Sequence, residues 1–133
     1  MAHILIVEDF VETGQAIQRL LQRHGHRVAH VETGEAALSY CDGADLPDLI
    51  ILDERMPGMA GLEVLQRLKS NPMTAQIGVV MYSAVGSDTF EDEALDAGAI
   101  ECWRKVSMRP DMLCLRVQQL IPDLPPRPQP REQ

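Results

Sequence analysis

Side chains that carry a charge or a hydroxyl group stand directly after several of the chain's short apolar runs. They are Glu8 and Asp9, then Asp53, then Ser83, and finally Lys105. Each one alone has an ordinary structural explanation, such as capping a helix, ending a strand or opening a turn. If the runs are neighbouring parallel strands, however, their carboxyl ends share one edge of a sheet. The five side chains then meet in a single crevice.

Three of these side chains are carboxylates, and carboxylates that share a crevice repel one another unless a cation joins them. Glu8, Asp9 and Asp53 therefore predict a hard divalent ion with oxygen ligands. Mg²⁺ fits best, because it takes few carboxylates, keeps several waters and leaves positions for phosphate oxygens. The sequence thus predicts a Mg²⁺ site with a place for a phosphoryl group.

The remaining side chains suit phosphoryl transfer, which depends mainly on positioning and on neutralising charge. A metal on one side and the Lys105 ammonium on the other would supply that neutralisation. Asp53, facing the ion, is then a nucleophile that forms an aspartyl-phosphate. The Ser83 hydroxyl is expected to contact a phosphoryl oxygen, and Ala84 leaves space for the group to enter.

Apolar runs alternate five times with amphipathic segments, and this alternation predicts the elements that position the crevice. Repeated βα units imply a parallel sheet with helices on both faces, since each crossover must be right-handed. Five such units favour the α/β, flavodoxin-like, doubly wound (βα)5 fold with strand order 2-1-3-4-5. Expected strands are 3–7, 27–31, 48–53, 77–82 and 100–104; expected helices are 13–24, a short helix capped by Thr33, 61–69, 88–97 and 111–121.

Length and composition limit the class of protein. A chain of 133 residues suits one domain, which we expect over residues 1–121. The proline-rich segment 122–133 is expected to be an extended, flexible tail or linker. The formal net charge of −8 and the lack of a basic cluster argue against a nucleic-acid partner.

The cysteines and the apolar runs indicate the compartment. The three cysteines form no CxxC pair, so neither a disulfide framework nor a zinc site is predicted, and this usage suits a reducing cytosol. The apolar run 4–7 is too short for a signal peptide or a membrane span. We therefore expect a cytoplasmic protein with no membrane partner.

The chain resembles the receiver domain of two-component response regulators, the class that includes the chemotaxis response protein, over about residues 3–121. The matching motifs are Glu8-Asp9, Leu52-Asp53-Glu54-Arg55-Met56-Pro57-Gly58-Met59-Ala60-Gly61, Ser83-Ala84, and Ala97-Gly98-Ala99 leading to Lys105. This resemblance implies that Asp53 is the phosphoacceptor and that the Arg55 backbone carbonyl joins Glu8, Asp9 and Asp53 around Mg²⁺. It also implies that Ser83 is the switch hydroxyl, that Lys105 contacts the phosphate, and that Pro57 and Gly61 shape the loop before the third helix.

Three positions depart from the family pattern. Cys102 stands where the family has an aromatic switch residue, and a thiol cannot fill the volume of a Tyr ring. Val106 stands where a proline follows the lysine in a cis peptide, and a cis bond without proline costs roughly 3 kcal/mol. Either the peptide is trans and Lys105 is re-aimed, or the cis bond persists. Ala60 replaces a frequent acidic residue, which we expect to matter little.

We expect a signalling domain, not an enzyme, that is phosphorylated on Asp53 by a sensor histidine kinase or a histidine phosphotransfer protein. Phosphorylation would switch a face formed by helix 88–97, strand 100–104 and helix 111–121, to which a downstream protein binds, and a homodimer on phosphorylation is left open. A receiver-like binding module with altered or no switching is the alternative that Cys102 and Val106 keep open.

Two other functions on the same topology are disfavoured. A flavodoxin would need a Ser/Thr/Gly-rich phosphate loop after the first strand, where this chain has the acidic run 9–13. A haloacid-dehalogenase-like phosphatase would need a second Asp two residues after Asp9, and Val11 stands there.

Overall fold

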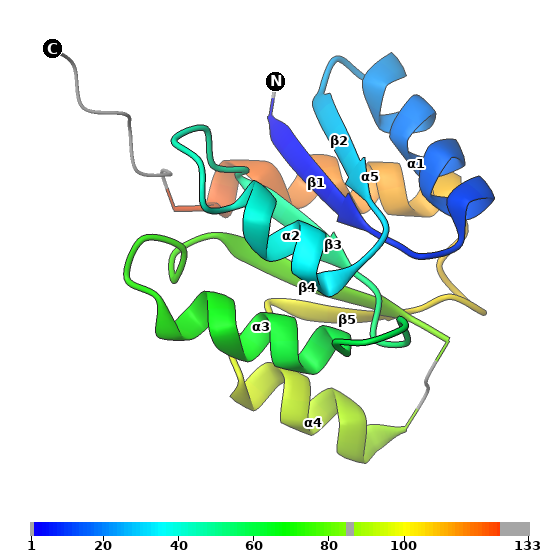
Figure 1. The fold of residues 1–133 in the computed structure, drawn as a ribbon. Helices are drawn as coiled ribbons and strands as arrows, with labels where there is room; N and C mark the ends of the chain where they lie inside the picture. Colours follow the sequence, from blue (N-terminus) through cyan, green and yellow to red (C-terminus); the bar gives the residue numbers. More distant parts are fainter. Residues whose placement is uncertain (1, 85–86, 126–133) are drawn as a thin grey trace, which may run out of the picture.

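A computed structural model describes residues 2–84 and 87–125 of the chain, and its centre is a five-stranded parallel sheet (Figure 1). The strands lie in the order β2-β1-β3-β4-β5, and each neighbouring pair is parallel, which confirms the predicted doubly wound topology. The strands are β1 (His3–Val7), β2 (Arg27–Val31), β3 (Leu49–Leu52), β4 (Gly78–Ser83) and β5 (Glu101–Arg104); the helices are α1 (Val11–Arg23), α2 (Gly34–Tyr40), α3 (Gly61–Ser70), α4 (Asp88–Asp96) and α5 (Pro110–Leu120).

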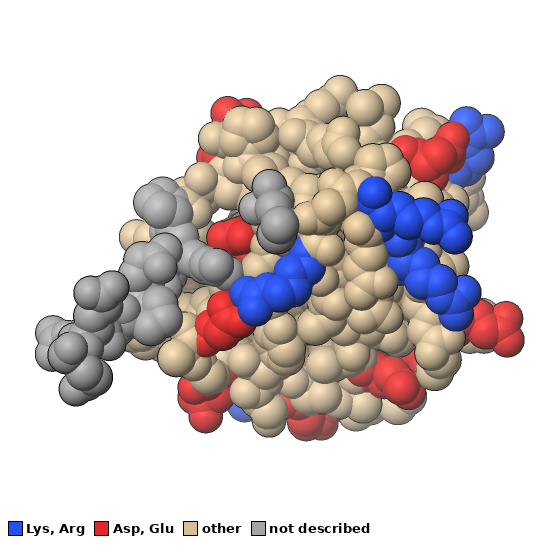
Figure 2. All heavy atoms as spheres, turned by 90° about the horizontal axis from the view of Figure 1, so that it is seen from above, with Lys and Arg blue, Asp and Glu red and all other residues tan. Residues whose placement is uncertain are grey.

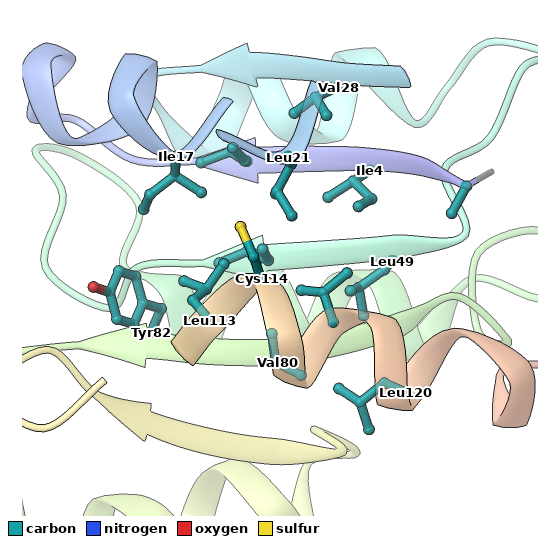
Figure 3. Close-up of a cluster of buried hydrophobic side chains, with 14 of the residues drawn as sticks. Ile4, Ile17, Leu21, Val28, Leu49, Val80, Tyr82, Leu113, Cys114 and Leu120 are labelled. Atoms are coloured by element: carbon teal, nitrogen blue, oxygen red, sulfur yellow. The ribbon is translucent and has the colours of Figure 1, made fainter. Parts of the chain in front are cut away.

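The central strands are buried on both sides because their side chains alternate between two cores. In β1, Ile4 and Ile6 point into a core shared with α1 and α5, and Figure 3 shows part of that core. Leu5 and Val7 point the other way, into a core shared with α2, α3 and α4. Their near-continuous apolar sequence is therefore the pattern that a strand covered by helices on both faces requires.

Most element bounds lie within two residues of the prediction, and the differences have local causes. α1 begins at Val11 instead of residue 13, and no side chain caps it, so the sequence carried no start signal. β3 is one residue shorter than expected at each end. The flanking residues still bond to β1 through their backbones, since the Asp48 amide donates to the His3 carbonyl (2.7 Å) and the Asp53 amide to the Val7 carbonyl (3.0 Å). β4 runs one residue further than expected and includes Ser83.

The short helix α2 begins as predicted, because the Thr33 hydroxyl accepts a hydrogen bond from the Ala36 amide at 3.0 Å. Ser87 caps α4 in the same way through the amide of Phe90. Both caps fix where the chain turns back toward the sheet after a strand.

The segment after α5 differs in part from the extended tail expected from its prolines. A 3₁₀ turn spans Ile121–Asp123, and Leu124 folds back onto the core shared with α1 and α5. Burial of the apolar Leu124 side chain stabilises the packing of residues 121–124 against the domain. The rest of the predicted tail, residues 126–133, lies outside the described residues.

On the face shown in Figure 2, basic side chains form small separate groups divided by uncharged surface, and acidic side chains lie mostly toward the margin, some of them directly beside a basic group. None of the helices in the described ranges is both long enough and apolar enough to cross a membrane.

Candidate functional site

Three carboxylates meet at the carboxyl ends of β1 and β3. One oxygen from each of Glu8, Asp9 and Asp53 lies within 4.8 Å of the other two. The backbone places them, because the Glu8 amide bonds to the Val31 carbonyl (3.0 Å) and the Asp53 amide bonds to the Val7 carbonyl (3.0 Å). Glu8 is only 2% exposed and Asp53 5%. The predicted convergence of the three acids is therefore present.

Lys105 lies beside this acidic cluster, next to Glu8 and Asp53. Its amide donates to the Ser83 carbonyl at 2.9 Å, which continues the pairing of β5 with β4 beyond the last strand residue. Its ammonium Nζ lies 2.5 Å from Glu8 Oε1 and 3.4 Å from Asp53 Oδ2. The chain thus brings together a cation and two buried carboxylates that are 97 and 52 residues away in sequence.

The electrostatics of the cluster raise the pKa of Asp53 from 3.8 to about 7. Burial contributes most, because it disfavours the charged form, and the negative charge of Glu8 adds to it, while Lys105 acts in the opposite direction. Burial also disfavours the Lys105 ammonium, but its hydrogen bond to Glu8 and the charge of Asp53 outweigh that effect and raise the pKa of Lys105. A cation that enters the cluster would relieve the repulsion between the carboxylates.

Ser83 and Ala84 lie beside this cluster at the end of β4. Ser83 is buried and stands in register with Arg104 of β5, directly before Lys105. Ala84 follows it and is exposed. A hydroxyl from β4 and an ammonium from the end of β5 therefore come to the same edge of the sheet as the carboxylates.

The loop after β3 borders the cluster on its open side. One hollow of about 420 Å³ is lined by Asp9 and by residues of this loop, which are Glu54, Arg55, Met56, Pro57 and Ala60. Gly58 has a φ of +80°, a conformation that favours glycine, and this turn sends the chain toward α3. A Cβ at Gly61 would overlap the Asp53 carbonyl, so glycine is required for α3 to begin this close to the site.

Glu54, the residue after Asp53, caps α3, a role that the sequence did not suggest. Ala60 occupies the N-cap position and has no side chain that can accept a hydrogen bond. The Glu54 carboxylate accepts one from the Leu62 amide at 2.7 Å in its place. The alanine at position 60 is tolerated because a side chain from the preceding loop performs the capping.

The two main departures from the family pattern have different outcomes. Throughout residues 2–84 and 87–125 no peptide bond is cis, so Lys105–Val106 is trans, and Lys105 still reaches Glu8 and Asp53. Cys102 is half-buried and packs toward α4, with its Sγ 4.0 Å from the Glu91 carbonyl. Trp103, the next residue of β5, points into the other core because side chains alternate along a strand.

His30 supports the acidic cluster from β2, and sequence reasoning missed it. Its Nε2 lies 2.8 Å from the Glu8 carbonyl, and because a carbonyl only accepts, this nitrogen donates. The ring occupies space above Gly14 of α1, where any Cβ would collide with it. The one available signal was a glycine inside an otherwise regular helix, which indicates close packing by a neighbour.

Tyr82 was also missed, although it precedes Ser83. Its ring centroid lies 5.6 Å from Lys105 Nζ, and its hydroxyl donates to the Met108 carbonyl at 3.0 Å. Neither contact can be predicted from the spacing of residues along the chain, because both depend on how β4 and β5 pair.

Comparison with known proteins places this arrangement in a family. The model of the response regulator receiver domain matches residues 4–118. The cyclic di-GMP phosphodiesterase response regulator RpfG of Xanthomonas campestris pv. campestris is 31% identical over 121 residues, which cover 90% of this chain and 32% of RpfG. The two-component response regulator ORR12 of Oryza sativa subsp. japonica is 32% identical over 97 residues, covering 73% of this chain and 80% of ORR12.

Solved structures of receiver domains and response regulators share the fold of this chain. The signal receiver domain of a histidine kinase from Syntrophus aciditrophicus has a TM-score of 0.85 at 26% identity and covers 100% of this chain and 98% of its own. The phosphorylated cyanobacterial phytochrome response regulator RcpA has a TM-score of 0.82 at 25% identity, covering 96% of this chain and 99% of its own.

The chain spans about a third of the length of RpfG and about a fifth of the response regulator PleD of Caulobacter vibrioides. The receiver-domain model matches residues 4–118, the part of the chain that carries the sheet and the acidic cluster. The chain therefore belongs to the response regulator receiver domain family of two-component signalling.

Proposed function

We propose that Asp53 is the phosphoacceptor of this receiver domain and that Glu8, Asp9, Asp53 and the Arg55 backbone carbonyl hold Mg²⁺. Support comes from one observation above all: oxygens of three carboxylates lie within 4.8 Å of one another, with Lys105 beside two of them. This donor set consists of hard oxygen atoms and suits Mg²⁺. Bound Mg²⁺ would neutralise the negative charge of the carboxylates and of the incoming phosphoryl oxygens.

In the proposed reaction, an Asp53 carboxylate oxygen attacks the phosphorus of a phosphohistidine on a partner protein. The new O–P bond forms an acyl phosphate, while the N–P bond breaks and the imidazole nitrogen leaves with the electron pair and takes a proton from solvent. Lys105 would neutralise a phosphoryl oxygen, and the Ser83 hydroxyl would donate a hydrogen bond to another. The donor would be a sensor histidine kinase or a histidine phosphotransfer protein.

The response is proposed to reach a downstream protein through α4, β5 and α5. Arg104 of β5 pairs with Glu91 of α4 (2.7 Å), and Arg116 of α5 pairs with Glu101 of β5, so the three elements are connected. Exposed apolar side chains on or beside these elements give a partner something to bury. They are Leu95, Ile100, Met112 and Leu115.

The finer assignments remain proposals of the same kind. They are a cytoplasmic location, a domain over residues 1–121 followed by a tail or linker over 122–133, a homodimer on phosphorylation, and Cys102 as the switch residue in place of an aromatic side chain.

Intact-mass spectrometry with a small phosphodonor tests the proposal. Acetyl phosphate with Mg²⁺ should add the mass of one phosphoryl group to the wild-type chain, and EDTA or Asp53→Asn should prevent the addition. Asp92→Asn, at an exposed carboxylate of α4, is the matched control and should be modified normally. An unchanged mass in a protein that binds Mg²⁺ would refute the proposal.

A Cys102→Tyr variant tests the role of the small residue on β5. If the thiol weakens the link between Ser83 and the face of α4, β5 and α5, a tyrosine should enlarge the phosphorylation-dependent chemical-shift changes on that face. Equal changes in both proteins would show that position 102 has no part in the response.

A further inference from the structure

We propose that Tyr82 positions Lys105 and couples its ammonium to the loop between β5 and α5. The inference rests on the proposed function, because it assigns to Lys105 the role of contacting the phosphoryl group. Tyr82 belongs to β4, lies directly before Ser83 and is 6% exposed, so its ring is held inside the fold beside the site.

The first contact is between the ring and the ammonium. Lys105 Nζ lies 5.6 Å from the centroid of the Tyr82 ring, within the distance at which a cation is attracted to an aromatic face. The same ammonium bonds to Glu8 and Asp53 on its other side. Lys105 is therefore held between an aromatic ring and two carboxylates.

The second contact is made by the other end of the same side chain. The Tyr82 hydroxyl donates to the Met108 carbonyl at 3.0 Å, and the Met108 amide donates to the Arg104 carbonyl at 2.9 Å. Burial raises the pKa of Tyr82, so the phenol keeps its proton and donates at neutral pH. The turn over residues 104–108, which carries Lys105, is thus bonded through Met108 to the Tyr82 hydroxyl.

A third contact fixes the plane of the ring. The Trp103 ring meets the Tyr82 ring edge-on, with centroids 6.5 Å apart and an angle of 74°. Such edge-to-face pairs favour one orientation over free rotation. Tyr82 accordingly touches the segment 103–108 at three places: before, at and after Lys105.

This chain has a specific need for such a residue. Val106 is 88% exposed and follows a trans peptide, so the residue after Lys105 does not restrain it. Cys102 packs against the core on the other face of the sheet, whereas Tyr82 and Trp103 lie in the core shared with α1 and α5. Any change in the position of the ammonium alters its contact with the Tyr82 ring, and the hydroxyl passes that change to Met108.

The experiment compares Tyr82→Phe and Tyr82→Leu with wild type. Phe keeps the ring and loses the hydroxyl, whereas Leu loses both. Tyr40→Phe is the matched control, since the Tyr40 hydroxyl bonds to His3 at the opposite end of the sheet (2.5 Å). For each protein we would measure the phosphorylation rate with acetyl phosphate and Mg²⁺, amide exchange in residues 104–108 before and after phosphorylation, and the ring-current shift of the Lys105 ε-methylene protons.

We expect Tyr82→Phe to be phosphorylated within about twofold of wild type and to keep the ring-current shift, but to lose the phosphorylation-dependent change in exchange at residues 104–108. Tyr82→Leu should lose the ring-current shift and be phosphorylated about five- to tenfold more slowly, the size expected for one lost cation–π contact. Tyr40→Phe should match wild type in all three measurements.

A wild-type exchange response in Tyr82→Phe, or a ring-current shift retained in Tyr82→Leu, would overturn the inference. If Tyr82→Leu does not fold, the nearly isosteric Tyr82→Phe still decides the question through amide exchange. The ring-current shift does not depend on phosphorylation, so a wild-type chain that carries the shift but accepts no phosphoryl group would refute the proposed function and leave the positioning of Lys105 intact.

Discussion

The Lys105 ammonium and the Glu8 carboxylate form an ion pair, with Nζ 2.5 Å from Oε1, although Glu8 is 2% exposed and the two residues are 97 positions apart. The second Glu8 oxygen accepts a hydrogen bond from the Phe10 amide at 3.1 Å. Glu8 is thus the meeting point of the lysine and of the proposed metal site. A cation in that site and Lys105 compete for the same carboxylate.

Replacing Lys105 with methionine should therefore raise the affinity for Mg²⁺. The substitution removes a positive charge from the cluster and frees Glu8 Oε1, and we expect Kd to fall roughly tenfold, which corresponds to about 1.4 kcal/mol. Isothermal titration calorimetry with MgCl₂ measures this. Lys105→Arg keeps the charge and should remain near the wild-type value. A weaker affinity in Lys105→Met would mean that the lysine supports the metal site instead of competing with it.

The raised pKa of Asp53 predicts how the stability of the metal-free protein depends on pH. Between the ordinary value of 3.8 and the folded value of about 7, the folded chain keeps a proton that the unfolded chain has lost. The contribution of Asp53 therefore destabilises the folded protein as pH rises from about 4 to about 7 and stays constant above that range.

Asp53→Asn should remove this dependence. In EDTA at pH 8, we expect urea unfolding to show the variant roughly 1–3 kcal/mol more stable than wild type, and the difference should shrink toward pH 4. Asp92→Asn, at an exposed carboxylate, should show no such trend. A wild-type protein whose stability rises through this range relative to Asp53→Asn would contradict the assigned environment of Asp53.

His30 is expected to maintain the metal site through the Glu8 backbone. His30→Phe keeps a ring above Gly14 but removes the donor to the Glu8 carbonyl, and we expect Mg²⁺ to bind about three- to tenfold more weakly. His30→Gln can restore the donor and much of the affinity. His24→Phe, on the exposed end of α1, is the control. Equal affinities in His30→Phe and wild type would limit the ring to a packing role.

Glu54 is expected to stabilise α3 as a substitute N-cap. Glu54→Ala should lower the free energy of unfolding by about 1 kcal/mol, because the Leu62 amide loses its acceptor. Ala60→Ser supplies a hydroxyl at the N-cap and should recover most of that loss in the double variant. Urea denaturation of the four proteins forms a double-mutant cycle. Additive effects of the two substitutions would count against the capping role.

The topology and the convergence of Glu8, Asp9, Asp53 and Lys105 could be predicted from the sequence because both depend on local pattern. The run Ile4–Val7 is apolar at every position, as a strand buried on both faces requires, and each acidic or basic site residue follows such a run. In a parallel sheet this placement alone brings Glu8, Asp53 and Lys105 to one edge.

The residues that were missed act through tertiary contacts. Tyr82, His30 and Glu54 reach partners that no spacing rule connects to them, at separations of 26, 22 and 8 positions. The start of α1 was placed two residues late because Phe10, at the N-cap, offers no side-chain acceptor. Supporting residues of this kind become visible only when the pairing of the strands is known.

The central claim is that the phosphoryl group is carried by the Asp53 carboxylate. Reduction of the phosphorylated chain with borohydride converts an aspartyl phosphate to homoserine, and peptide mapping by mass spectrometry then identifies the position. After treatment with acetyl phosphate and Mg²⁺, we predict homoserine at position 53 and unmodified Glu8 and Asp9. Homoserine at another position, or none in a protein that binds Mg²⁺, would contradict the account.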